Sequence, residues 1–156
     1  MVDAFELKER EGRNKLKEKL DTSKKIEKYE FTEEKFNPID CFATGVTGGK
    51  ICYEIKNRDI DIDKYKKEGF MLEYKKYQRL MEYNRLSGGT SYYINFFQDG
   101  KGISWDVSRI KDAEDRVEIK YCTETTAEDY EKGKVPKEVI MLKAEEGIVF
   151  NYGNEE

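Results

Sequence analysis

The fold is decided by residues 38–56, which read PIDCFATGVTGGKICYEIK. Two runs of strand-forming residues flank a turn rich in glycine, and this order predicts an antiparallel β-hairpin. The second run alternates in character, so its side chains are expected on two faces. Ile51, Tyr53 and Ile55 would share one face, and Cys52, Glu54 and Lys56 the other.

The register of this hairpin determines what lies beside Asp40. A turn centred on residues 47–48 places Asp40 opposite Ile55, between Glu54 and Lys56 on the facing strand. Two carboxylates and an ammonium would then meet at one point. Neighbouring carboxylates repel unless a cation lies between them, and oxygen ligands without histidine or cysteine suit Mg²⁺ or Mn²⁺ better than zinc. A lysine beside such an ion can orient or deprotonate a water.

These residues resemble the motif of the PD-(D/E)xK nuclease superfamily. The matching segments are Pro38-Ile39-Asp40 and Glu54-Ile55-Lys56, on a hairpin that follows an N-terminal helix, with an isoleucine inside the Pro-Asp pair as a mild departure. The resemblance covers about residues 5–98. It implies an α+β fold with a restriction-endonuclease-like αβββαβ core, a central mixed β-sheet flanked by helices. Residues 99–156 would add a β-rich C-terminal extension to a single domain spanning residues 1–156.

The resemblance also implies which residues hold a metal ion. Asp40, Glu54 and the backbone carbonyl of Ile55 would bind Mg²⁺ or Mn²⁺. A glutamate of the first helix would join them, with Glu9 as the first candidate and Glu11 as the second. Both glutamates have the alternative of being ordinary surface residues in a charge-rich helix.

Three further residues would take part in the chemistry by the same resemblance. Lys56 would position or activate the attacking water, and Lys76 and Gln78 on the next long helix would steady the phosphate or the water. Lys76 has an alternative, because a lysine on an apolar stripe often extends its ammonium to the rim of the core.

The activity that the resemblance implies is that of a Mg²⁺-dependent DNA endonuclease, a phosphodiester hydrolase. A compact chain without a helicase or specificity module is most similar to the Holliday-junction-resolvase-like branch. Branched DNA would then be the substrate, and its symmetry would call for a homodimer.

Composition excludes other kinds of site. The chain of 156 residues has no histidine, which excludes Ser-His-Asp and Cys-His catalysis and histidine-based zinc sites. No apolar run approaches the roughly 20 residues that span a bilayer, and no signal peptide is expected at the N-terminus. Three cysteines without a CxxC motif are typical of free thiols in a reducing compartment, so a cytoplasmic location is expected.

Charge is distributed unevenly along the chain. Residues 111–156 contain 7 Lys/Arg and 13 Asp/Glu, which leaves 22 basic and 20 acidic residues in 1–110, where the expected site lies. The net charge of −4 argues against a generic nucleic-acid binder. A DNA path could nevertheless follow basic residues of the first half: Lys15, Lys17, Lys19, Lys24, Lys25, Arg58, Lys66 and Lys67.

The remaining pattern predicts helices over residues 3–20 and 70–87 and strands over 29–36, 91–98, 103–110 and 116–122. A last hairpin is expected over residues 137–150, bent at Glu146-Gly147. Trp105 is expected in the core. A second ExK tripeptide, Glu118-Ile119-Lys120, lacks a preceding Pro-x-Asp partner and is expected on an exposed strand face.

Two alternatives to an active nuclease stay open at this point. The chain could have the nuclease fold without activity and serve as a DNA- or protein-binding module. It could also be a small α+β interaction protein in which the 38–56 hairpin matches the motif by coincidence.

Overall fold

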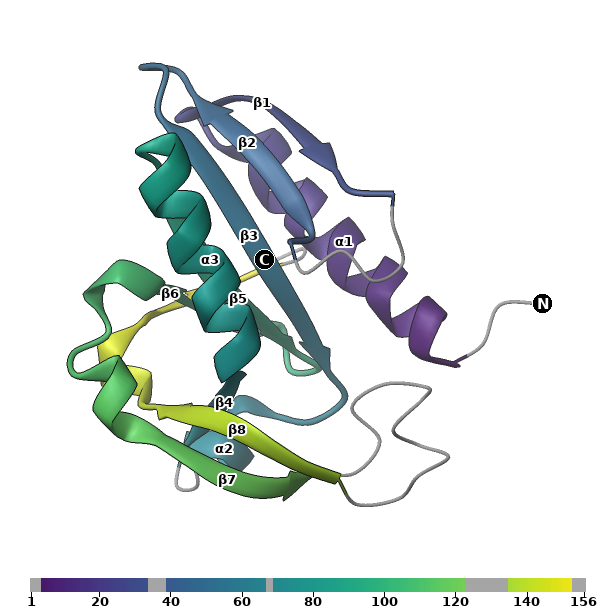
Figure 1. The fold of residues 1–156 in the computed structure, drawn as a ribbon. Helices are drawn as coiled ribbons and strands as arrows, with labels where there is room; N and C mark the ends of the chain where they lie inside the picture. The colour runs from purple at the N-terminus through teal and green to yellow at the C-terminus, as the bar shows by residue number, and fades with distance from the viewer. Residues whose placement is uncertain (1–3, 34–38, 67–68, 123–134, 153–156) are drawn as a thin grey trace.

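The computed structural model describes residues 4–33, 39–66, 69–122 and 135–152 (Figure 1). The helices are α1 (Ala4–Thr22), α2 (Ile62–Lys66) and α3 (Tyr74–Ser87), with 3₁₀ turns at Val107–Arg109, Ala113–Arg116 and Ala144–Glu146. The strands are β1 (Ile26–Phe31), β2 (Cys41–Gly45), β3 (Lys50–Arg58), β4 (Phe70–Glu73), β5 (Thr90–Phe97), β6 (Lys101–Asp106), β7 (Val117–Cys122), β8 (Val135–Leu142) and β9 (Ile148–Asn151). No described helix combines the length and the apolar character needed to cross a membrane.

The strands form two sheets. The central sheet has the order β1-β2-β3-β5-β6-β9, and a smaller sheet has the order β4-β8-β7. In the central sheet β3 and β5 run parallel, with Ile51 beside Thr90 and Arg58 beside Phe97, while the other described pairs are antiparallel. A parallel pair needs a long crossover, and here it contains α2, β4 and α3. The expected α+β fold with a central mixed sheet flanked by helices is confirmed.

The two long helices lie on opposite sides of the central sheet, with α3 in front of β3 and α1 behind it (Figure 1). The cluster on the α1 side contains Leu16 and Leu20 of the helix together with Tyr53, Ile51 and Ile55 of β3. The larger cluster on the α3 side contains Cys52 of β3 and side chains from both sheets. The alternation predicted for residues 51–55 is therefore confirmed.

The register of the hairpin differs from the prediction by one residue. Strand β2 pairs with β3 so that Cys41 lies opposite Tyr53 and Thr44 opposite Lys50. The turn contains three residues, because the N–H of Gly45 donates to the carbonyl of Gly49 and the N–H of Gly48 donates to that of Gly45. Gly48 has φ of +90°, which is the left-handed residue of a three-residue hairpin loop. The described pairing ends at Cys41 opposite Tyr53, and the N–H of Asp40 donates to the carbonyl of the same Tyr53.

Several elements also differ from the predictions, and β6 ends at Asp106 rather than at residue 110. Residues 70–73 form β4, so the second long helix begins at Tyr74 and not at residue 70. The first strand begins at Ile26, and residues 34–38, including Pro38 of the predicted motif, lie outside the described residues. The predicted hairpin over residues 137–150 is wrong, because β8 pairs with β4 and β7 whereas β9 pairs with β6 in the other sheet.

Two predictions about buried residues are confirmed. The side chain of Trp105 is fully buried, in ring contact with Phe70 of the small sheet and Tyr93 of the central sheet. Cys41 and Cys52 are free thiols. They are buried in the two different clusters, on opposite faces of the central sheet, so the hairpin does not bring their sulfur atoms together for a disulfide.

Gly89 allows β5 to begin directly beside β3. A Cβ atom at this position would lie 2.3 Å from the backbone oxygen of Lys50 and 2.9 Å from its carbonyl carbon. We expect Gly89→Ala to lower the free energy of unfolding by about 2–3 kcal/mol, because the clash is with backbone that must move. Urea denaturation followed by circular dichroism measures this loss.

Gly49→Ala is the matched control for that substitution. A Cβ at Gly49 would have no atom within 4 Å, and its φ is not positive. Its free energy of unfolding should stay within about 0.5 kcal/mol of the original. Equal losses in the two variants would contradict the close approach of β3 and β5 at Gly89.

Candidate active site

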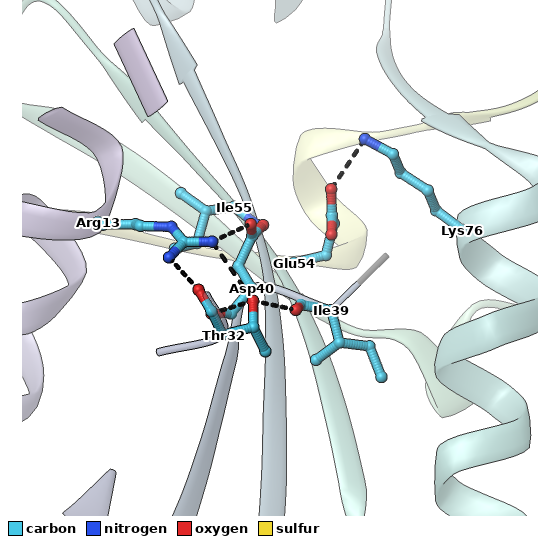
Figure 2. A network of polar contacts seen from close by, with 7 residues as sticks. All are labelled: Arg13, Thr32, Ile39, Asp40, Glu54, Ile55 and Lys76. Carbon is cyan, nitrogen blue, oxygen red and sulfur yellow. Dashed lines mark hydrogen bonds and ion pairs between the residues drawn. The ribbon is translucent and has the colours of Figure 1, made fainter. Parts of the chain in front are cut away.

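Asp40, the residue before β2, lies beside Glu54 of β3, and both β2 and β3 are inner strands of the central sheet. The backbone N–H of Asp40 donates to the carbonyl of Tyr53, the residue before Glu54, over 3.0 Å. Figure 2 shows the two carboxylates between Arg13, which comes from α1, and Lys76, which comes from α3. The two carboxylates that the sequence predicts together are therefore brought together by the hairpin.

The carboxylate of Asp40 is held in place by groups from β3 and α1. Its carboxylate accepts a hydrogen bond of 2.8 Å from the backbone N–H of Ile55 and lies 3.5 Å from a guanidinium nitrogen of Arg13 (Figure 2). Arg13 also donates to Thr32. Helix α1 can bring Arg13 this close because Gly12 faces β3, where a Cβ would lie only 3.1 Å from the Ile55 side chain.

Glu54 is almost fully buried, with 4% of its surface exposed, and Lys76 is its counter-ion. The ammonium of Lys76 lies 2.8 Å from the Glu54 carboxylate and 3.5 Å from that of Glu73. Glu73 in turn lies 2.8 Å from the ammonium of Lys137 on β8. The sequence left open whether Lys76 extends its ammonium to the rim of the core. In the structure Lys76 is an ion-pair partner of Glu54.

The pKa values of this pair shift because of burial and charge. Burial raises the pKa of Glu54, Lys76 lowers it, and the nearby Asp40 raises it again through its charge and a hydrogen bond, with a net increase. Burial opposes the charge of Lys76, but the carboxylates of Glu54 and Glu73 outweigh it and raise the Lys76 pKa. An extra proton or a cation beside Glu54 would relieve the repulsion between the two carboxylates.

Lys56 follows two residues after Glu54 on the same face of β3. It makes no hydrogen bond or ion pair with any residue that the structure describes, and its side chain is half-buried. Burial, and then the charges of Lys76 and Arg58, lowers the pKa of Lys56 to about 8. An ammonium with a pKa in this range can release or take up a proton near neutral pH.

The other predicted site residues lie in different places. Glu9 has an exposed side chain, but it is close enough to the site for partial desolvation, and then the charge of Asp40, to raise its pKa. The carboxylate of Glu11 accepts from the Asn57 amide over 3.4 Å, on the α1 face of β3. Gln78 is exposed, and on α3 it lies two residues from Lys76, a spacing that directs side chains to different faces.

Two arginines at the site were not predicted as site residues. Arg13 had no sequence signal except its position four residues after Glu9, one turn along the same helix. Arg58 was expected on a surface DNA path, but only 9% of it is exposed. The alternation of β3 could have indicated this, because Arg58 shares the α3 face with Glu54 and Lys56.

The donor set at Asp40 and Glu54 suits a hard divalent cation. Among the residues that the structure describes, no group of three or more His, Cys, Asp or Glu side chains gathers in a way that could hold an ion. Two adjacent carboxylates are nevertheless enough for Mg²⁺, which keeps several waters and takes one or two protein carboxylates. The residues therefore fit Mg²⁺ or Mn²⁺ better than a metal that needs a full protein cage.

Comparisons with known proteins give a fold and no family. No family model matches the sequence, and no curated protein matches it. The structure is similar to that of Hjc, a Holliday junction resolvase from the archaeal hyperthermophile Archaeoglobus fulgidus, with a TM-score of 0.51 and 14% sequence identity. The match covers 67% of this chain and 82% of the resolvase. The likeness shows that this chain has the mixed α+β architecture of that resolvase.

Proposed function

We propose that this protein is a metal-dependent nuclease that hydrolyses phosphodiester bonds of DNA. The observation that carries the proposal is the placement of the Asp40 and Glu54 carboxylates side by side, with Lys56 on the same strand face. A fold similar to that of a Holliday junction resolvase supports it. The Glu118-Ile119-Lys120 tripeptide has no such arrangement, since its strand face is exposed.

Asp40, Glu54 and the carbonyl of Ile55 would hold Mg²⁺ or Mn²⁺, with Glu9 near enough to add a further oxygen, directly or through water. When bound, such an ion polarises a phosphodiester oxygen and lowers the pKa of a coordinated water. Lys76 would move its ammonium from Glu54 towards Glu73, which already lies 3.5 Å away. This exchange keeps the charge of Lys76 compensated.

Lys56 would orient or deprotonate the attacking water, because its lowered pKa leaves part of the ammonium population neutral near pH 8. Lys76 would steady the phosphate from the first turn of α3. Gln78 would have to act from the exposed side of the helix, on the substrate rather than on the carboxylates.

The similarity to a resolvase suggests branched DNA as the substrate. We propose a four-way junction as the preferred form and a homodimer as the active state, because a two-fold symmetric junction suits a two-fold symmetric enzyme. A cytoplasmic location belongs to the same proposal.

The second candidate function is an inactive nuclease-fold protein that binds DNA or another protein. The observation that favours it is the full pairing of the carboxylates, with Arg13 on Asp40 and Lys76 on Glu54. In an inactive protein these two ion pairs would simply replace the metal ion.

Cleavage assays separate the two candidates. Labelled four-way junctions and linear duplexes of matched sequence are incubated with the protein and Mg²⁺, Mn²⁺ or EDTA. We expect cleavage of the junction with either metal and none with EDTA, because the water must be activated by the ion. Calorimetric titration with Mn²⁺ should show binding to the unmodified protein.

A result without cleavage of any substrate, but with retention of the junction in a gel shift, would replace the enzyme by the binding module. Absence of both Mn²⁺ binding and cleavage would contradict the proposed metal site. Equal cleavage of junction and duplex would keep the nuclease and remove the preference for branched DNA.

A further inference from the structure

A small pocket lies next to the candidate active site, on the α3 side of β3. It is lined by Lys56, Arg58, Met71, Glu73, Lys76 and Tyr93. Three of these six side chains are cationic. Neither the expected metal nor the expected attack on the water requires Arg58, so the pocket contains charge that the proposed reaction does not use.

Arg58 has polar neighbours but no carboxylate. Its Nε donates to the side-chain oxygen of Asn95 over 2.7 Å, and its terminal nitrogens donate to the hydroxyls of Tyr65 and Tyr93 over 3.3 and 3.5 Å. Its guanidinium also lies 4.7 Å from the centre of the Tyr65 ring. A buried charge normally has a paired opposite charge, and among the described residues Arg58 has none within ion-pair distance.

The surroundings leave positive charge in excess. Four cationic side chains in this region outnumber the two carboxylates of Glu54 and Glu73. They are Lys56, Arg58, Lys76 and Lys137. Glu73 lines the pocket, but its carboxylate is shared between Lys137 at 2.8 Å and Lys76 at 3.5 Å. Helix α3 begins at Tyr74, directly after Glu73, whose side chain does not cap the helix, so the positive end of the helix dipole also faces this region.

A second observation points to a missing polar partner. The side-chain nitrogen of Asn95 is fully buried and has no hydrogen-bond partner among the described residues. The oxygen of the same amide holds Arg58. Asn95 lies beside Lys56 in the β3–β5 pairing, so this orphaned donor belongs to the same buried polar group. Buried polar atoms usually have partners, in the protein or in water or a ligand.

We propose that this pocket binds a phosphate group through Arg58 and Lys56. The planar guanidinium suits the two oxygens of a phosphate, and the ammonium adds a second charge. Arg58 lies about 13 Å along β3 from Glu54, at about 3.3 Å per residue. That the phosphate is part of a nucleic acid rests on the proposed function, in which the pocket holds a phosphate near the scissile one. The proposed affinity for phosphate itself does not rest on that function.

Two sources of phosphate are compatible with this chemistry, an internal diester of a continuous strand and a terminal monoester. Binding is measured in EDTA, so that the result does not depend on metal or cleavage. The probes are inorganic phosphate and short single-stranded oligonucleotides of one sequence, with and without a 5′-phosphate.

The test variant is Arg58→Met, which keeps the length of the side chain and removes its charge. We expect it to weaken the binding of inorganic phosphate at least tenfold. Arg109→Met is the matched control, because Arg109 is 84% exposed and lies 3.6 Å from Asp106, away from the pocket. The control should bind phosphate as the original protein does, and equal binding by both variants would overturn the proposal.

The oligonucleotides then identify the source. A tenfold advantage of the 5′-phosphorylated oligonucleotide that disappears in Arg58→Met indicates a terminal monoester. Equal binding of both oligonucleotides, weakened equally by the substitution, indicates an internal diester. Binding of both that is unaffected by Arg58→Met would contradict the pocket as a nucleic-acid site.

A measurement on the unmodified protein covers the case in which Arg58→Met does not fold. Phosphate is titrated into ¹⁵N-labelled protein, and the Nε–H signal of Arg58 and the side-chain amide of Asn95 are followed by NMR. Both should shift with one saturating curve. Signals that stay in place at saturating phosphate would overturn the proposal, whatever the outcome of the cleavage assays.

Discussion

Asp40→Asn is expected to lower metal-dependent DNA cleavage by about three orders of magnitude, or about 4 kcal/mol of transition-state stabilisation. The substitution removes one of the two adjacent charges that would hold the ion. An asparagine oxygen can still accept the hydrogen bond from the backbone N–H of Ile55, so the hairpin should keep its conformation. Initial rates on a junction substrate, together with calorimetric Mn²⁺ titration, measure the two effects separately.

The chain offers a matched control in its second ExK tripeptide. Glu118→Gln removes a carboxylate from β7, where the side chain is exposed and 3.8 Å from Lys120. Its cleavage rate should match that of the original protein. Full activity in Asp40→Asn, or an equal loss in both variants, would rule out Asp40 as a metal ligand.

Trp105→Ala is expected to destabilise the protein by about 4 kcal/mol, which is a large share of the 5–15 kcal/mol typical of a domain. Trp105 joins the two sheets: its ring centre lies 5.2 Å from that of Phe70 on β4 and 5.8 Å from that of Tyr93 on β5. Its indole N–H donates to the carbonyl of Lys143 over 3.0 Å. Truncation would leave a cavity between the sheets and an unpaired carbonyl.

Urea denaturation followed by far-UV circular dichroism measures that loss. Trp105→Phe should lose less than the alanine variant, because it keeps most of the ring contacts and loses the hydrogen bond. Leu86→Ala is the control, since Leu86 is 70% exposed, and should change stability by less than about 0.5 kcal/mol. If Trp105→Ala lowers the free energy of unfolding by less than about 1.5 kcal/mol, Trp105 does not join the two sheets as described.

The residues of the hairpin show how far sequence alone reaches. Strict alternation over residues 51–56 was sufficient to predict which side chains share a face, because one face packs against α1 and the other against α3. The register was wrong by one residue because three glycines permit several turns. The left-handed conformation of Gly48 selects the three-residue loop, and no pattern in the strands specifies this.

Residues 70–73 show where local patterns fail. Phe70 and Leu72 fit a helical stripe and a strand equally well over four residues. They form a strand because they pair with Leu142 and Ile140 of β8, about 70 residues away in the chain. The separate sheets of β8 and β9 depend on similar distant pairings, which a single sequence does not reveal.

The candidate site was predictable in its acids and less so in its cations. The meeting of Asp40, Glu54 and Lys56 follows from spacing on adjacent strands, whereas Lys76 was named as a site residue only through the family resemblance. Arg13 reaches the site because Gly12 lets α1 approach β3, and this effect depends on the tertiary contact. The catalytic and metal-binding roles of all the predicted site residues stay predictions: Glu9, Asp40, Glu54, Ile55, Lys56, Lys76 and Gln78.

The parallel pairing of β3 with β5 has a consequence for the order in which the protein forms on the ribosome. The hairpin that carries Asp40 and Glu54 can close as soon as residues 38–56 have emerged, since its partners are neighbours in the chain. Strand β3 has no second neighbour until residues 90–97 follow, and β4 waits still longer for β8. During translation the two acidic residues can therefore come together before Lys76 arrives with α3.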